Sequence, residues 1–220
     1  LSIRRQRQMC IRDRVIELDT NKSDKERLDK QFAFAMELDK EKLIGRQTYL
    51  ANGERKENDA EHAWHMAIMA LILSEYANEE IDVLRTISMI LIHDVVEIDA
   101  GDTYAYDENG KKSQREREVK AAERLFGMLP KDQAVKFRNL WEEFEAQETK
   151  EAKFARTMDN IQPVVLNDAS DGKSWVEHGV HLSQILNRNK NTAKGSEVIW
   201  NYAKENFIDE NVRKGNIIND

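Results

Sequence analysis

The chain contains little of the material that forms disulfides, tight turns and membrane spans. Its 220 residues include one cysteine, two prolines and nine glycines. The single Cys10 cannot form an internal disulfide and fits a reducing compartment. No run of about 18 apolar residues occurs, so the sequence predicts no transmembrane helix. With 34% charged and 40% hydrophobic residues, the composition instead predicts a soluble globule made mostly of helices.

The charge balance of the chain is acidic. The formal net charge is −7, although residues 1–14 carry five arginines and only one aspartate. An acidic body disfavours binding to a nucleic-acid polymer. A small phosphorylated substrate remains compatible with it, because such a substrate needs only a local positive pocket.

The first residues stand apart from the rest. The segment RRQRQMCIRDR resembles translated sequencing-adapter read-through, and the basic start lacks the apolar region that follows in a secretory signal. We therefore expect residues 1–20 to be a non-native or disordered extension. Residues 21–220 have the length of one well-buried domain, and we expect a cytoplasmic protein.

Helical patterns cover most of the remaining sequence. Ser23-x-x-Glu26 and Asn58-x-x-Glu61 are capping boxes, and apolar residues recur at helical spacing after both. Asn52-Gly53 is a turn signal within a polar stretch, and no strand of period 2 is convincing. The sequence therefore predicts an all-α fold, a single compact helical bundle. The expected helices cover residues 23–39, 40–44, 58–76, 79–97, 113–127, 132–147, 149–168, 175–187 and 196–207.

Four metal-capable side chains are widely spaced along these helices. They are His62, the adjacent pair His93-Asp94, and Asp159. The pair lies near the end of a strongly apolar segment, where an unpaired imidazole or carboxylate costs free energy when it is desolvated. Two imidazoles with two carboxylates suit Mn, Fe, Co, Ni or Zn better than Ca or Mg. We therefore predict a site for a divalent cation between the central helices.

Two acidic residues after this pair are candidates for catalysis. Successive side chains on a helix diverge by roughly 100°, so His93 and Asp94 would share an ion only if it lay against the helix between them. Glu97 follows Asp94 by three residues, on about the same helical face, which suits an acid/base group. Asp102 follows in an expected loop over residues 99–110, where it is placed to orient water or a substrate hydroxyl.

Other polar residues have a default structural interpretation. Arg46 and Arg55 would be ordinary surface residues, but a phosphate needs cations and arginine offers it a fork of donors. The remaining histidines are expected in the core (His65) and on a surface or interface (His178 and His181), with a second metal site at the latter two left open. Tyr104 and Tyr106 are expected to be turn residues.

The ordered pattern His…His-Asp…Asp resembles the HD superfamily of metal-dependent phosphohydrolases. Longer stretches around these residues, Asn58–His62, His93–Asp102 and Met158-Asp159, resemble the branch that contains bacterial 5′-deoxynucleotidases and their eukaryotic relatives. The similarity runs over about residues 28–187. Two-iron HD proteins supply further histidines between the pair and the final aspartate, and this chain has none there. The pattern therefore favours one metal ion and hydrolysis over oxygen chemistry.

The resemblance implies a role for each candidate residue. His62, His93, Asp94 and Asp159 would hold one divalent ion, whose identity stays open among Mn, Co, Ni, Fe, Zn and Mg. It implies that Glu97 is the acid/base, that Asp102 lies near the attacking water, and that Arg46 holds the substrate phosphate, with Arg55 a second candidate. The next family position is often tryptophan, linked to selection of deoxyribose. Here it is Gln47, which leaves the sugar preference open.

These observations predict an enzyme, a metal-dependent phosphohydrolase. The expected reaction removes phosphate from a nucleoside 5′-monophosphate, including a deoxyribonucleotide. The alternatives are another phosphorylated small molecule or a phosphodiester as substrate, or a non-catalytic, metal-stabilised nucleotide-binding module. We expect a small phosphorylated partner and neither a nucleic-acid polymer nor a membrane. A homodimer stays open, because Trp200, Tyr202 and Phe207 suit a partner surface and a core equally.

Overall fold

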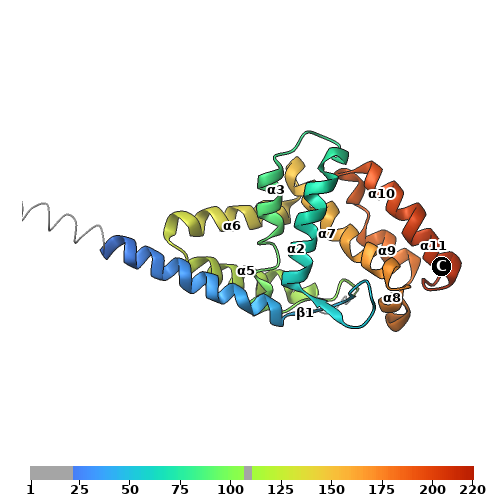
Figure 1. The fold of residues 1–220 in the computed structure, drawn as a ribbon, viewed down its shortest axis with the longest axis horizontal. Coiled ribbons are helices and arrows are strands. Elements are labelled where there is room, and N and C mark those ends of the chain that lie inside the picture. Colours follow the sequence, from blue (N-terminus) through green and yellow to red (C-terminus); the bar gives the residue numbers. More distant parts are fainter. Residues whose placement is uncertain (1–21, 107–110) are drawn as a thin grey trace, which may run out of the picture.

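The longest described helix, α7 (Lys150–Ala169), organises the fold. A computed structural model describes residues 22–106 and 111–220 of the chain, so the predicted extension over residues 1–20 lies outside the described residues. Figure 1 shows α7 beside α2, with the C-terminal helices to one side. Helix α7 contacts, among others, α2 (Asp59–Leu73), α3 (Val83–Ile90), α6 (Lys131–Ala146), α10 (Glu197–Ala203) and the short 3₁₀ helix η3 (Thr192–Lys194).

The other described elements are mostly helices, which confirms the predicted all-α class. A helix over residues 22–37 precedes them and runs along α5 and α6 (Figure 1). Within the described ranges, no helix is both long enough and apolar enough to cross a membrane. The remaining elements are η1 (Leu38–Leu43), η2 (Ser74–Tyr76), α4 (Glu97–Ala100), α5 (Lys111–Gly127), α8 (Lys173–His178), α9 (Leu182–Arg188), η4 (Lys204–Ile208) and α11 (Asp209–Lys214).

A small antiparallel hairpin corrects the expectation that the chain has no strand. Strands β1 (Gly45–Tyr49) and β2 (Lys56–Asn58) pair with each other, and the predicted Asn52-Gly53 turn lies between them, with Gly53 at a φ of 68°. The alternation was invisible in the sequence because the inward-facing side chains are polar, Thr48 and Glu57. The hairpin carries Arg46 and Glu57 to the N-terminus of α2.

The segment that holds His93 and Asp94 is not helical in the predicted way. Helix α3 ends at Ile90 and α4 begins at Glu97, so the prediction of one helix over residues 79–97 is wrong. Tight turns fill the interval, with the N–H of Ile92 donating to the Met89 carbonyl. Nδ1 of His93 lies 2.7 Å from the Ile90 carbonyl oxygen, which a continued helix would use for the N–H of Asp94. The side chain therefore competes with the backbone and ends the helix.

Two further predicted helices are interrupted near the C-terminus. The expected helix over residues 175–187 is split into α8 and α9 at Gly179, whose φ of 56° ends α8 in the left-handed region. The expected helix over residues 196–207 changes into the π-helical turn η4 after Ala203. Both breaks let the C-terminal segments fold back on α7.

Helix α7 lies between two apolar clusters. Phe154, Met158 and Ile161 of α7 belong to the main core, which includes residues of α2, α3, α5 and α6. The second half of α7 contributes Val164 to a smaller cluster with Trp175 and Ile185. The polar residues of α7 between these contacts are consequently held in fixed positions.

The packing of α7 against η3 requires a glycine at residue 195. A Cβ there would overlap the carbonyl oxygen of Lys153 and Oγ1 of Thr157, which is fully buried. We predict that Gly195→Ala lowers the free energy of unfolding by about 1–3 kcal/mol, the usual range for overpacking.

Urea denaturation of the wild type and of Gly195→Ala would check this, with Gly127→Ala as the matched control. Gly127 lies at the end of α5, and a Cβ there meets nothing within 4 Å. An unchanged midpoint for Gly195→Ala would show that α7 and η3 can separate without cost.

Candidate metal centre

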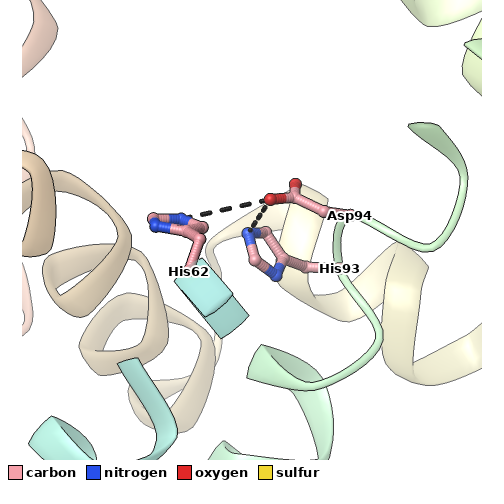
Figure 2. Close-up of side chains that lie close together, drawn as sticks. All are labelled: His62, His93 and Asp94. Atoms are coloured by element: carbon pink, nitrogen blue, oxygen red, sulfur yellow. Dashed lines mark ion pairs between the residues drawn. The ribbon is translucent and has the colours of Figure 1, made fainter. Parts of the chain in front are cut away.

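The structure brings the four predicted ligands together from three places in the fold. His62 comes from α2, His93 and Asp94 come from the turns after α3, and Asp159 comes from α7. Oδ2 of Asp94 lies 3.0 Å from Nε2 of His93 and 4.0 Å from Nε2 of His62. Oδ1 of Asp159 lies 3.3 Å from Nε2 of His62 and 3.8 Å from Nε2 of His93. Figure 2 shows how His62, His93 and Asp94 point toward one another.

These separations fit a shared cation. Ligand atoms about 2.1 Å from one ion lie roughly 3.0 Å apart at right angles and about 4.2 Å apart when opposite. The observed distances of 3.0–4.0 Å fall within this range. The donor set also fits, because imidazole and carboxylate together bind divalent transition metals.

Both imidazoles present the correct nitrogen to such an ion. Nδ1 of His62 lies 2.8 Å from Oε1 of Gln162, and Nδ1 of His93 lies 2.7 Å from the Ile90 carbonyl. Nε2 of Gln162 donates to Glu57, which turns the amide oxygen toward His62. Because carbonyl oxygens only accept, each Nδ1 carries the proton of the neutral ring, which leaves the lone pair of that form on Nε2. Within the described structure, Nε2 of His93 is buried without a hydrogen-bond partner.

Arg46 lies against the carboxylates of this cluster. Its Nη1 donates to Oδ2 of Asp94 at 2.9 Å and to Oδ1 of Asp59 at 3.2 Å, and its Nε lies 3.5 Å from Glu57. Asp59 and Glu57 were not among the predicted site residues. Asp59 precedes His62 by three residues on α2, so its helical spacing carried a usable signal.

Two further arginines hold Asp159. Nη1 of Arg156 and Nη2 of Arg188 donate to Oδ2 of Asp159, at 2.9 and 3.0 Å. Arg156 also stacks on Phe144, 4.3 Å from the ring centre, and so has little freedom. This pairing leaves the other oxygen, Oδ1, toward the histidines. Arg156 could be found from its i, i+3 spacing to Asp159, whereas Arg188 on α9 gave no sequence signal.

Crowding of charge shifts the pKa of most groups in the site. Burial alone would lower the pKa of His93, but Asp94 and Asp159 outweigh it and raise that pKa to about 10. Burial would raise the pKa of Asp159, yet Arg188, the two histidines and Arg156 hold it well below its usual value. A bound cation would take the place of the proton that His93 otherwise carries.

The pKa of Glu97 is shifted in the opposite direction to that of Asp159. Burial, followed by the charges of Asp94, Asp59 and Asp102, raises the pKa of Glu97 well above its usual value. Burial also raises the pKa of Asp102, although Arg46 opposes this. The raised pKa favours the protonated form of Glu97 next to the cluster, which suits a proton donor.

A pocket opens above the cluster. Its lining includes Arg46, Glu97, Asp102 and Arg188. Arg55 lies elsewhere: both of its terminal nitrogens pair with Glu61, and it is absent from the described lining of this pocket. Its predicted contact with phosphate stays a prediction that this geometry does not favour.

The remaining histidines and tyrosines have clear surroundings. His65 is half-buried, with Nδ1 3.2 Å from Nε2 of Gln162. His178 is exposed and packs on Tyr104, and His181 pairs with Asp220. Neither His178 nor His181 belongs to a group of three metal-capable side chains within residues 22–106 and 111–220. Tyr104 and Tyr106 were expected only as turn residues, but both line the pocket.

The chain belongs to the HD domain family, whose pattern matches residues 38–200. This confirms the family resemblance of its motifs. A solved structure from Magnetospirillum magnetotacticum, described as a predicted metal-dependent phosphohydrolase, is 46% identical, with a TM-score of 0.83 over 87% of this chain and 96% of that one. A Pyrococcus furiosus protein at 23% identity and a TM-score of 0.57 shares the fold.

Curated relatives match a shorter stretch. The 5′-deoxynucleotidase HDDC2 of Homo sapiens is 30% identical over 114 residues, which is 52% of this chain and 54% of that protein. The mouse protein of the same name is 31% identical over 114 residues, 52% of this chain and 56% of that protein. The chain thus spans about half the length of the curated relatives it matches.

The contact between Gln162 and His62 gives a prediction on metal affinity. Gln162 is fully buried and fixes the ring of His62 from behind. We predict that Gln162→Leu weakens Co²⁺ binding about 10–100-fold, the usual effect of removing a group that orients a metal-binding imidazole. Isothermal titration of the metal-free protein with Co²⁺ would measure it.

Gln133→Leu is the matched control, because Gln133 only meets Gln31 at a distant helix contact. A melting curve of each variant separates loss of metal from loss of fold. Equal Co²⁺ affinity in wild type and Gln162→Leu would contradict the proposed orientation of His62.

Proposed function

We propose that the protein is a metal-dependent phosphohydrolase that removes phosphate from a nucleoside 5′-monophosphate. The observation that carries this proposal is the convergence of two imidazoles and two carboxylates beside a pocket that Glu97, with its raised pKa, also lines. The names of the relatives, a 5′-deoxynucleotidase over half its length and a predicted metal-dependent phosphohydrolase, support the same reaction class.

One divalent ion would be held by His62, His93, Asp94 and Asp159. When bound, it would supply positive charge that polarises a phosphoryl oxygen and lowers the pKa of water. The donor set admits Mn, Co, Ni, Fe and Zn, with Mg less well suited. The cytoplasmic location stays a prediction, and the identity of the metal and a homodimer stay open.

Glu97 supplies the proton that the reaction requires. Hydrolysis forms a bond from water oxygen to phosphorus and breaks the bond from phosphorus to the 5′-oxygen. The leaving oxygen needs a proton, and the attacking water loses one. Glu97, whose pKa is raised by burial and by the neighbouring carboxylates, gives its proton to the leaving oxygen and recovers one from the water, so it ends unchanged. Asp102 lines the same pocket and is placed to orient that water.

Two arginines of the pocket can face the phosphate. Arg46 is bound to Asp94 and Asp59, so most of its charge is balanced by these carboxylates. Arg188 uses one nitrogen on Asp159, and 35% of its side chain is exposed. The guanidinium of Arg188 has further N–H donors, arranged as a fork, which could donate to a phosphate in the pocket. We infer that Arg188 holds the phosphate together with Arg46.

Phosphate release across nucleoside 5′-monophosphates with Mn²⁺, Co²⁺, Ni²⁺, Zn²⁺ and Mg²⁺ tests the proposed function. We expect orthophosphate from at least one monophosphate, and a kcat about 10²-fold or more lower in Glu97→Gln, because general acid catalysis contributes on that order. Glu116→Gln, on the exposed surface of α5, is the matched control. A folded, metal-loaded protein that releases no phosphate from any nucleotide refutes the proposal.

The role of Arg188 predicts a change in substrate affinity. Arg188→Gln should raise KM for the monophosphate about tenfold or more, since a charged hydrogen bond to phosphate is lost. Arg213→Gln, at an exposed ion pair of α11, should leave KM unchanged. Steady-state kinetics of Arg55→Gln in the same series tests the other candidate for phosphate binding. A larger rise in KM for Arg55→Gln than for Arg188→Gln would favour Arg55, the residue inferred from the sequence.

A further inference from the structure

The pocket continues away from the metal centre along one face of α7. Asn160, Pro163, Val164 and Asn167 line it at i, i+3, i+4 and i+7 spacing. From Asp159 to Asn167 the helix rises about 12 Å, at 1.5 Å per residue. This distance is comparable to the length of an extended nucleoside monophosphate. A substrate with its phosphate at Asp159 would therefore place its far end near Asn167.

The two ends of the pocket differ in charge. The metal end is lined by charged groups, among them Arg46, Asp94 and Glu97. Away from that end the lining includes the neutral residues Asn167, Tyr104, Tyr106, Ser174 and Trp175. None of these five residues offers a cation to a second or third phosphate. An uncharged organic group fits this part of the pocket better.

Hydrogen-bond direction fixes the amide of Asn160. Nδ2 of Asn189 donates to the Ile185 carbonyl, so its Oδ1 accepts from the hydroxyl of Thr192 at 3.1 Å. With its proton used in this way, Oγ1 of Thr192 accepts from Nδ2 of Asn160 at 3.0 Å. Oδ1 of Asn160 is then left over as a buried acceptor, and it has no partner within the described residues.

The side-chain amide of Asn167 also has an unused acceptor. Its Nδ2 donates to the Pro163 carbonyl at 2.8 Å, which can only accept, so the amide cannot be reversed. Its Oδ1 is buried and has no partner in the described structure. A buried acceptor without a donor costs about 1–3 kcal/mol. Two such oxygens along one pocket wall indicate that a ligand supplies the donors.

Aromatic rings form another part of the lining. Tyr104 meets Tyr106 edge-on, with ring centres 5.3 Å apart, and also meets His178 at 4.8 Å. Trp175 is buried beside them. Flat aromatic surfaces next to amide acceptors suit a planar, hydrogen-bond-donating ring.

We propose that Asn160, Asn167 and Tyr104 form a subsite for the nucleoside part of the substrate, in which Asn160 accepts from a sugar hydroxyl and Asn167 accepts from an amino group of the base. The assignment of the two ends rests on the proposed function, because the phosphate is placed at the metal centre. The subsite itself rests on the neutral lining and the two unused oxygens.

Titration with deoxyadenosine and, separately, with inorganic phosphate tests this subsite on the metal-loaded protein. Asn167→Leu should weaken deoxyadenosine binding about tenfold or more and leave phosphate binding unchanged. Asn206→Leu is the matched control, because Nδ2 of Asn206 also donates to the carbonyl four residues before it, but on the exposed surface. Tyr104→Leu, at a half-buried position in a loop, tests the same subsite if Asn167→Leu does not fold.

The outcomes separate the two proposals. Equal deoxyadenosine affinity in Asn167→Leu and wild type overturns the subsite, as does wild-type protein that binds phosphate but no deoxyadenosine. Wild-type protein that binds deoxyadenosine through Asn167 yet releases phosphate from no nucleotide supports the subsite and refutes the phosphohydrolase. Weaker binding of purine deoxyriboside, which lacks the amino group, by wild type supports the role of Asn167.

Discussion

The carboxylate of Asp159 is the interaction on which the rest of the site depends. One oxygen faces the two histidines, while the other accepts hydrogen bonds from Arg156 and Arg188. A single side chain of α7 thereby connects α2, the turns after α3, and α9. The two arginines keep this carboxylate ionised inside the protein, and a charge held in that state is what a cation requires of a ligand.

Residues of α7 line the pocket along its length, so the pocket has one end at the metal centre and another end near Asn167. Arg156, Asp159 and Asn160 lie near the metal centre, and Asn167 lies about two turns further along the same helix. The apolar residues between them enter two separate clusters, which prevents the helix from rotating. The direction in which a substrate would lie is consequently a property of one helix and of the residues that pack against it.

The sequence allowed the family, the helical class and the convergence of His62, His93, Asp94 and Asp159 to be anticipated, because His93-Asp94 ends an apolar segment and the ordered set of four resembles the HD superfamily. It did not predict the turn at His93, since the competition between its ring and the backbone for the Ile90 carbonyl depends on three-dimensional position. Nor did it predict Arg188, which reaches Asp159 from a distant helix. Helical spacing identifies neighbours within one element, whereas contacts between elements need the fold.

The charges around the pocket explain why ligand binding at its two ends would depend differently on a bound cation. Seven carboxyl groups surround three guanidinium groups, those of Arg46, Arg156 and Arg188. The carboxyl groups are Glu57, Asp59, Asp94, Glu97, Asp102, Glu145 and Asp159. The pKa of Asp59 is raised to about 7, chiefly by burial, and the pKa values of Glu97 and Asp102 are also raised, so part of the excess is relieved by protons. A bound cation would add positive charge at this end and so favour an anionic phosphate there. The neutral end near Asn167 involves no such charge, so affinity for an uncharged nucleoside and affinity for phosphate have separate physical origins in this pocket.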